Sequence, residues 1–441
     1  MGGRRYNICM VSCFFHPNMG GVENHIYQLS QCLLARGHKV VVITHAYGNR
    51  IGVRYLTSML KVYYLPVHVF FKQCTVPTMF TTLPMIRDIC IREQVDILHG
   101  HGAFSPLCHE ALLHARTMGI RAVFTDHSLF GFADYSSINS NKFLEFVLTD
   151  VDHAICVSYT SKENTVLRAK LPPDLVSVIP NAVDTSCFTP DPSKRTPGRV
   201  TIVVISRLVY RKGMDLLAGV IPIICKRHSH VDFLIGGDGN YRVLLEQIRE
   251  QHDLMDRVTL LGGLDHSQVR DVLVQGDIFL NTSLTEAFCI AIVEAVSCGL
   301  QVISTKVGGV PEVLPNDMIC MAEPNVSSLA EALHEAIEVQ RSGQQLDAWE
   351  SHQRVTDMYN WYDIAERTEK VYDRVIMSAN RTYVDQIYKH YSRGPVAGIV
   401  YVALLTLLQL VYTLVAWIRP AKGVDVVPDV IDDKNDDVIQ R

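Results

Sequence analysis

A basic segment at residues 206–213 carries the clearest candidates for binding a charged ligand. Arg207 and Lys212 follow an apolar run at residues 200–206, so we expect them at the carboxyl edge of a parallel sheet, where this architecture binds its ligands. A diphosphate is an anion that a fork-shaped guanidinium beside an ammonium matches well. Alone, the segment fits a solvated basic loop at least as well. The elements around it decide in favour of a diphosphate site.

A pair of glutamates follows a second apolar run, at residues 278–281. Glu286 and Glu294 are eight positions apart, which on a helix is slightly over two turns and about 12 Å along the axis. From one helix face, one carboxylate can reach a sugar hydroxyl and the other a ribose. The free N–H groups at the start of that helix can bind phosphate oxygens. The spacing alone is a weak signal, but its place after the basic segment indicates a nucleotide-sugar site.

Two further candidates lie where strands are expected to end. Gly20 and Gly21 follow the first strand, and paired glycines let the backbone approach a ligand closely at a helix N-terminus. The alternative, a tight strand-to-helix turn, holds with or without a ligand. His127 follows the apolar run at residues 122–125 and is a candidate contact to a donor sugar, although a lone histidine is more often structural.

Patterns that suggest metal chemistry are weaker. Asp150 and Asp152 have the spacing of metal-dependent sugar transferases, but they precede a strand and so fall at the wrong edge of the sheet. His99 and His101 have no third ligand nearby in the sequence, which argues against a zinc site. The glycines at residues 236–239 lack the G-x-G-x-x-G spacing of a nicotinamide-binding fold. We therefore expect no metal and no cofactor.

Composition narrows the possible functions. The net charge is −5, so no nucleic acid is indicated as a partner. The twelve cysteines are scattered singly with no C-x-x-C, which argues against a disulfide framework and favours a reducing compartment. Arg4 and Arg5 before residues 6–15 mimic a weak signal peptide, but no small-residue cleavage site follows. This run is interpreted as a first buried strand.

Short apolar runs alternate with amphipathic stretches, which is typical of a parallel α/β architecture. The pattern occurs twice and predicts two Rossmann-like domains facing a cleft, residues 1–185 and 199–360, with a linker at residues 186–198. Residues 361–395 are expected to be bridging helices. Strands are expected at residues 8–13, 40–44, 97–99, 122–125 and 154–157, and then at residues 200–206, 231–235, 258–260, 278–281 and 302–305.

Residues 396–418 form an uninterrupted apolar segment of 23 residues without a formal charge. About 20 apolar residues span a bilayer, and a buried core helix of this length would show a polar stripe. A single transmembrane helix is therefore predicted, followed by an acidic tail at residues 419–441 that we expect to be disordered. Without a signal peptide, the region before Val396 should be cytosolic and the tail lumenal, although the flanking basic residues nearly cancel.

Together these segments resemble the retaining glycosyltransferases of family four, which have the GT-B fold. A closer resemblance, to the phosphatidylinositol-glycan class A family, rests on residues 14–23, 125–134, 157–165 and 285–289. It implies transfer of N-acetylglucosamine from UDP-N-acetylglucosamine to phosphatidylinositol with retention, as the first step of GPI-anchor synthesis. It also implies the cytoplasmic face of the endoplasmic reticulum and a complex with other membrane subunits.

The resemblance gives each candidate residue a role. Glu286 and His127 would contact the donor sugar as the catalytic residues. The first domain would receive the acceptor and the second the UDP-sugar. The donor-binding residues would be Arg207 and Lys212 at the diphosphate, Glu294 at the ribose, and Gly20, Gly21 and Cys289.

The chain departs from the general family-four pattern at three positions. Cys13 stands where the family usually has an aspartate, and Ala287 and Cys289 stand where many members have glycines, a variant that the class A proteins share. With no obvious covalent nucleophile, the simplest chemistry is electrostatic stabilisation of departing UDP. Two other classes stay open: a non-catalytic membrane scaffold, which would fail to bind UDP, and a nicotinamide oxidoreductase, which cofactor fluorescence would reveal.

Overall fold

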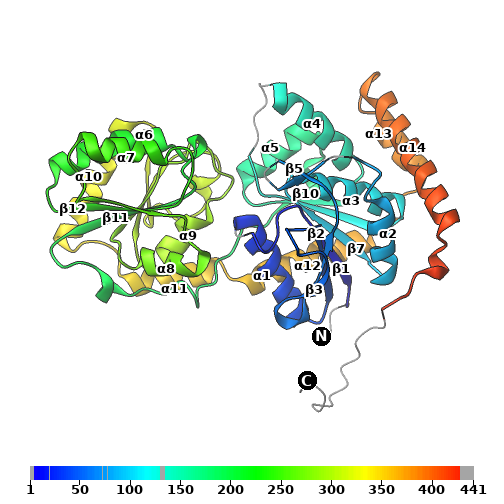
Figure 1. The fold of residues 1–441 in the computed structure, drawn as a ribbon, viewed down its shortest axis with the longest axis horizontal. Coiled ribbons are helices and arrows are strands. Elements are labelled where there is room, and N and C mark those ends of the chain that lie inside the picture. The colour runs from blue at the N-terminus through cyan, green and yellow to red at the C-terminus, as the bar shows by residue number, and fades with distance from the viewer. Residues whose placement is uncertain (1–3, 19, 72, 77, 130–134, 428–441) are drawn as a thin grey trace, which may run out of the picture.

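The computed structural model describes residues 4–18, 20–71, 73–76, 78–129 and 135–427. Two α/β units lie side by side along the long axis of the molecule (Figure 1). Part of the motif at residues 125–134 and most of the acidic tail, residues 428–441, lie outside the described residues. The expected disorder of the tail therefore stays a prediction.

The first unit is built on a sheet that has eight strands among the described residues. The order is β10 (Val176–Val178), β9 (His153–Cys156), β8 (Arg121–Asp126), β7 (Ile97–His101), β1 (Asn7–Val11), β2 (Lys39–His45), β4 (Lys61–Leu65) and β3 (Gly52–Tyr55). Only the edge strand β3 runs antiparallel to its neighbour. The central strands are buried on both faces, as a parallel sheet requires.

Helices cover both faces of this sheet, and a small hairpin lies beside it. The helices are α1 (Gly21–Ala35), α2 (Leu83–Arg92), α3 (Pro106–Thr117), α4 (Tyr135–Leu148) and α5 (Tyr159–Ala169). The hairpin pairs β5 (Val69–Phe71) with β6 (Cys74–Thr75). Short 3₁₀ turns are η1 (Thr57–Met59), η2 (Pro173–Leu175) and η3 (Pro192–Lys194).

The second unit repeats the plan with six strands, all parallel. The order is β13 (Val258–Gly262), β12 (Val231–Gly236), β11 (Val200–Ile205), β14 (Ile278–Asn281), β15 (Gln301–Thr305) and β16 (Ile319–Ala322). Its helices are α6 (Met214–Arg227), α7 (Arg242–Gln251), α8 (His266–Leu273), α9 (Ile290–Ser297), α10 (Val326–Ser342) and α11 (Ala348–Met358), with turns η4 (Tyr210–Lys212) and η5 (Val310–Glu312). The strand order reverses between β11 and β14, which opens a crevice at their carboxyl ends.

The strands expected from the sequence are all present, with ends that differ by at most two residues. The strands that the sequence patterns missed are β3, β4, β5, β6, β10 and β16. Apart from β4, an interior strand of five residues, they are short or lie at sheet edges, where partial exposure breaks the continuous apolar run that marks a buried parallel strand. The two Rossmann-like units are therefore confirmed.

After the second sheet the chain returns to the first unit. Helix α11 packs against α9, whereas α12 (Trp361–Met377) packs against α1. Tyr372 of α12 shares a hydrogen bond with His99 Nδ1 on β7 at 2.7 Å. Helix α13 (Tyr383–Tyr391) follows, and its His390 Nε2 contacts the carbonyl oxygen of Phe146 at 3.1 Å. The helices expected at residues 361–395 thus become part of the first unit.

The apolar helix α14 (Ala397–Ile418) lies along the first unit, and the turn η6 (Ala421–Gly423) follows it (Figure 1). Leu405 and Leu408 are buried, while Leu410, Leu414 and Trp417 are exposed. Only 17% of the most apolar 18-residue stretch of this helix is buried, whereas the core helix of a soluble protein is mostly buried. This helix is the one described segment long and apolar enough to cross a membrane.

A buried ion-pair network replaces the metal site that an Asp-x-Asp pattern suggests. Arg116 donates from Nε to Asp150 at 3.0 Å and from Nη1 to Asp152 at 2.9 Å. Asp152, which directly precedes β9, also accepts a hydrogen bond from the backbone N–H of Ala122. Both carboxylates therefore lie at the edge opposite the crevice, as the sequence predicted.

Replacing Asp152 with asparagine should lower stability and spare the chemistry. The change keeps the shape but removes one of the two negative charges that pair with the buried Arg116, and breaking a buried ion pair costs about 3 kcal/mol. Thermal unfolding should show a lower midpoint for Asp152→Asn, while turnover per folded molecule stays within about twofold. Asp256→Asn, an exposed position, is the control. Lost turnover in a folded Asp152→Asn protein would contradict a structural role.

Candidate active site

A cavity of about 170 Å³ lies between the two units. Its residues from the first unit are Gly20, Gly21, Asn24, His25, Asn181 and Ala182. Those from the second are Leu264, His266, Val269, Ile290 and Glu294, and Trp361 of the returning helix α12 completes the lining. Three of the predicted donor-binding residues, Gly20, Gly21 and Glu294, therefore meet at one cavity although they come from opposite halves of the chain.

Next to the cavity residue Ile290, the loop after β11 contacts the loop after β14. Lys212 Nζ forms an ion pair with Glu286 Oε1, which also accepts a hydrogen bond from Ser283 Oγ at 2.8 Å. Burial alone would lower the pKa of Lys212, but the adjacent Glu286 carboxylate raises it. Gly213 has φ of 66°, and a Cβ there would lie 1.8 Å from the carbonyl oxygen of Thr282. Glycine is thus required for the two loops to meet.

The two glutamates do not share a helix face, so that prediction is wrong. Helix α9 begins at Ile290, which leaves Glu286 in the preceding loop and Glu294 inside the helix. Cys289 caps the helix with φ of 68°, a left-handed conformation in which glycine is least strained. The chain therefore turns at Cys289, and a spacing counted along one continuous helix does not apply. Burial raises the pKa of the Cys289 thiol to about 12, so this group is no nucleophile.

Glu294 has a partner that the sequence patterns missed. Glu294 is 6% exposed, and its carboxylate lies 3.4 Å from His266 Nε2. This hydrogen bond raises the pKa of His266. His266 is the first residue of α8 and follows the carboxyl end of β13, which is the positional signal that could have identified it.

Arg207 is exposed at the end of β11, close to the first unit. The pKa of Glu23, in the first turn of α1, is raised by burial, and the positive charge of Arg207 opposes that rise. A Cβ at Gly20 would lie 2.6 Å from Glu23 Oε2, whereas a Cβ at Gly21 would meet no atom within 4 Å. A larger residue at position 20 would displace only the flexible end of the Glu23 side chain, and Gly21 borders open space at the start of α1.

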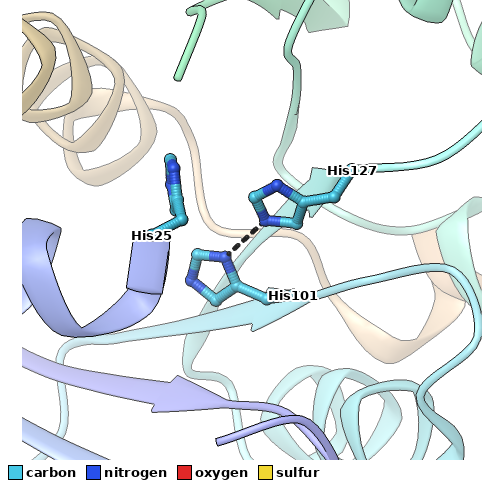
Figure 2. A group of neighbouring side chains, drawn as sticks. All are labelled: His25, His101 and His127. Atoms are coloured by element: carbon cyan, nitrogen blue, oxygen red, sulfur yellow. Dashed lines mark hydrogen bonds between the residues drawn. The ribbon is translucent and has the colours of Figure 1, made fainter. Parts of the chain in front are cut away.

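Three histidines gather at the cavity, which His25 lines: His25 from α1, His101 at the end of β7 and His127 after β8 (Figure 2). His127 Nε2 shares a hydrogen bond with His101 Nδ1 at 3.3 Å. The ring of His25 packs edge-on against His127, with centroids 4.7 Å apart, and against Trp361. His127 thus reaches the cavity through His25, which the sequence patterns missed because nothing marks a polar residue inside α1 as functional.

Burial keeps these rings uncharged. It lowers the pKa of His127 to about 3 and holds the pKa values of His25 and His101 well below their usual range. His127 is therefore a neutral hydrogen-bonding group, which suits contact with a sugar hydroxyl. It carries no positive charge with which to bind phosphate.

The same histidines also bear on metal binding. Among the described residues, two groups have ligand atoms close enough for an ion: this triad, and a second group of His228, His334 and Glu338. The sequence shows no third ligand near His101, but the fold brings His25 and His127 next to it from other elements. His99 takes no part, since its two nitrogens contact Tyr372 and Thr125. The expectation of a metal-independent enzyme stays a prediction.

Comparison with solved structures shows the fold. The fold resembles sucrose-phosphate synthase from Thermosynechococcus elongatus, with a TM-score of 0.71 and 21% identity over 84% of this chain and 99% of that one. It also resembles the lipopolysaccharide glycosyltransferase WaaG, with a TM-score of 0.63 and 14% identity over 84% of this chain and 100% of that one. Residues 189–353 match the family described as glycosyl transferases group 1. The protein is a glycosyltransferase with the GT-B fold.

Sequence relatives define the family within that class. Residues 45–134 match the family described as PIGA (GPI anchor biosynthesis). The chain is 57% identical to a human phosphatidylinositol N-acetylglucosaminyltransferase subunit, over 97% of this chain and 88% of that protein. It is 54% identical to the Arabidopsis thaliana protein of the same name, over 97% and 95%. The chain belongs to this family of phosphatidylinositol N-acetylglucosaminyltransferase subunits, which are glycosyltransferases of GPI-anchor biosynthesis.

Acid should destabilise the protein through its buried histidines. The folded state holds His99, His101 and His127 neutral, whereas the unfolded chain binds protons below pH 6.5. Stability should therefore be present above pH 6.5 and fall as the pH drops, by about 1 kcal/mol per histidine between pH 6.5 and 5.5. Thermal unfolding across this range measures the slope.

A variant separates this effect from general acid sensitivity. His99→Gln removes one buried titrating ring, so its stability should depend less steeply on pH. The exposed control His252→Gln should keep the slope of the original protein. Equal slopes for all three proteins would show that the histidines do not control acid stability.

Proposed function

We propose that this protein transfers N-acetylglucosamine from UDP-N-acetylglucosamine to phosphatidylinositol with retention of configuration, as the first step of GPI-anchor biosynthesis. The observation that carries the proposal is the cationic pair, Arg207 and Lys212, at the crevice of the second unit, where Lys212 forms an ion pair with Glu286. The names of the human and Arabidopsis relatives supply the sugar and the lipid. Structural neighbours of the fold include Anabaena HepE, whose crystal structures hold UDP and UDP-glucose.

Arg207 and Lys212 bind the diphosphate in this proposal. Lys212 is held by Glu286, and the ion pair keeps a charged ammonium in a partly buried place until phosphate oxygens arrive. Arg207 is exposed, so its guanidinium is free to turn onto the diphosphate. Two cations of different reach would then stabilise the negative charge that grows on departing UDP.

The remaining site residues divide between the ribose and the sugar. Glu294 binds the ribose hydroxyls from inside the cavity. Glu286 and the neutral His127 bind the transferred sugar, from the second and the first unit respectively, with Gly21 leaving room at the start of α1. Retention without a covalent intermediate fits the protonated Cys289 thiol. In this scheme no metal ion takes part.

The test is transfer of labelled N-acetylglucosamine to phosphatidylinositol by the purified complex, with and without EDTA. Activity should survive chelation. Arg207→Ala and Lys212→Ala should each lower kcat/KM about tenfold or more, since a charged hydrogen bond is worth about 1.5 to 3 kcal/mol. Measuring UDP affinity of each variant locates the loss at the diphosphate.

Arg211→Ala is the matched control, because Arg211 is the exposed neighbour in the same turn η4. It should retain near-normal activity. Normal turnover in both single variants would rule out the diphosphate assignment. A wild-type protein that binds no UDP would favour the non-catalytic scaffold, and metal-reversible loss on chelation would assign a catalytic ion.

We further propose that the protein works at the endoplasmic reticulum membrane beside other membrane subunits, with its two units cytosolic. The relatives are named as subunits, which supports an assembly, and α14 supports a single membrane span. In the present arrangement Arg419 forms an ion pair with Asp88 at 3.0 Å, and the N–H of Val427 contacts the carbonyl oxygen of Arg92. A spanning α14 requires these contacts at its far end to separate.

Topology can be read from glycosylation and proteolysis. Three asparagines lie in the N-x-S/T sequence that is the acceptor for N-glycosylation. Asn281 is buried against Ser304 Oγ, Asn325 caps α10, and Asn380 is exposed before α13. With a cytosolic catalytic region, Asn380 should carry no glycan, and protease added to intact microsomes should digest both units and spare a short C-terminal fragment. A sequon introduced after Arg419 should become glycosylated. A glycan on Asn380, or protection of the large units, would reverse the orientation.

A further inference from the structure

A carboxylate of the second unit caps a helix of the first. Glu312, in the turn η5, accepts hydrogen bonds from the backbone N–H groups of Tyr159 at 2.5 Å and Thr160 at 2.8 Å. The hydroxyl of Thr160 donates to the same carboxylate at 2.6 Å. Three hydrogen bonds thus join the two units at the first turn of α5.

This contact completes the N-terminus of α5. The first four N–H groups of a helix lack partners within the helix. In α5, the N–H of Ser161 donates to Oγ of the N-cap residue Ser158, and the N–H of Lys162 makes the first regular helical bond, to the Ser158 carbonyl oxygen. The free N–H groups of Tyr159 and Thr160 are those bound by Glu312 of the second unit. A negative charge there is also favoured by the helix dipole, so α5 presents a specific receptor for one carboxylate.

The same segment is tied to the loop that carries the candidate catalytic Glu286. The N–H of Gly309 donates to the carbonyl oxygen of Glu286 at 2.9 Å. A Cβ at Gly309 would lie 2.1 Å from the carbonyl oxygen of Ala287 and 2.6 Å from Ser158 Oγ. Gly309 therefore lies directly between the Glu286 loop and the start of α5, and no larger residue fits there.

From these contacts we infer that Glu312 is a latch between the units that positions the Glu286 loop of the donor side against the first unit. The inference rests on the proposed function, in which Glu286 of the second unit and His127 of the first unit both contact the donor sugar. Glu312 touches neither, so it is a positioning residue. Its carboxylate is exposed, which lets water replace the helix N–H groups when the cleft opens. The latch is reversible.

If Glu312 is such a latch, its loss should lower the turnover rate without changing the affinity for the donor. The residues assigned to the nucleotide, Arg207, Lys212 and Glu294, all belong to the second unit. UDP should therefore bind with unchanged affinity when Glu312 is lost. Transfer needs both units, so kcat should fall because fewer complexes are closed at any moment.

The experiment compares Glu312→Ala, Glu312→Gln and Thr160→Val in the purified complex. We expect Glu312→Ala to lower kcat about tenfold, the other two to lower it less, and UDP affinity to stay within about twofold of the original. Hydrogen exchange at Tyr159 and Thr160 should accelerate in Glu312→Ala. The double variant Glu312→Ala with Thr160→Val should be no worse than Glu312→Ala alone, since the two groups act as one contact.

Glu323→Ala, an exposed glutamate of the same unit, is the matched control and should change nothing. The thermal midpoint of each variant verifies folding. Unchanged kcat and unchanged exchange in Glu312→Ala would overturn the latch, as would a loss of UDP affinity, which would place Glu312 in the donor site. If the wild-type complex fails to transfer N-acetylglucosamine, the proposed function fails, while exchange at α5 still tests the contact.

Discussion

The direction of the buried parallel strands is the constraint on which the site depends. A parallel sheet that is covered on both faces must route every connection over a face, so all strand carboxyl ends collect at one edge. In this protein that edge carries Gly20 after β1, His127 after β8, Arg207 after β11 and Glu286 after β14. Because the two edges face one another, residues far apart in the chain form one cleft.

The chain's return to the first unit adds what two separate sheets would lack. Trp361 closes the cavity and packs on His25, while Tyr372 hydrogen bonds His99 behind the histidine triad. The wall of the site nearest the first unit is thus partly built by residues that follow the second unit in sequence. A fragment ending at residue 360 would leave His25 and His99 without these partners.

Sequence patterns predicted the sheets and the edge residues because both follow from local signals: an apolar run, and a polar residue where it stops. They failed where distant elements meet. His25 reads as one polar residue of an ordinary helix, and only the fold places it against His127. The placement of Glu286 on a helix failed for a local reason, since Cys289 adopts a left-handed conformation usually reserved for glycine and interrupts the expected helix.

The two units are joined by two stretches of chain, one between β10 and β11 and one between α11 and α12. These stretches are anchored near one another: Arg367 of α12 donates to the carbonyl oxygen of Val178, and Ser297 of α9 contacts both Phe188 in the linker and His352 in α11. A body held by one tether can rotate about any axis, whereas two neighbouring tethers leave one easy rotation, about the line through both. Any opening of the cleft is therefore expected to be a hinge rotation about that line, which would bring the same two edges together again on closure.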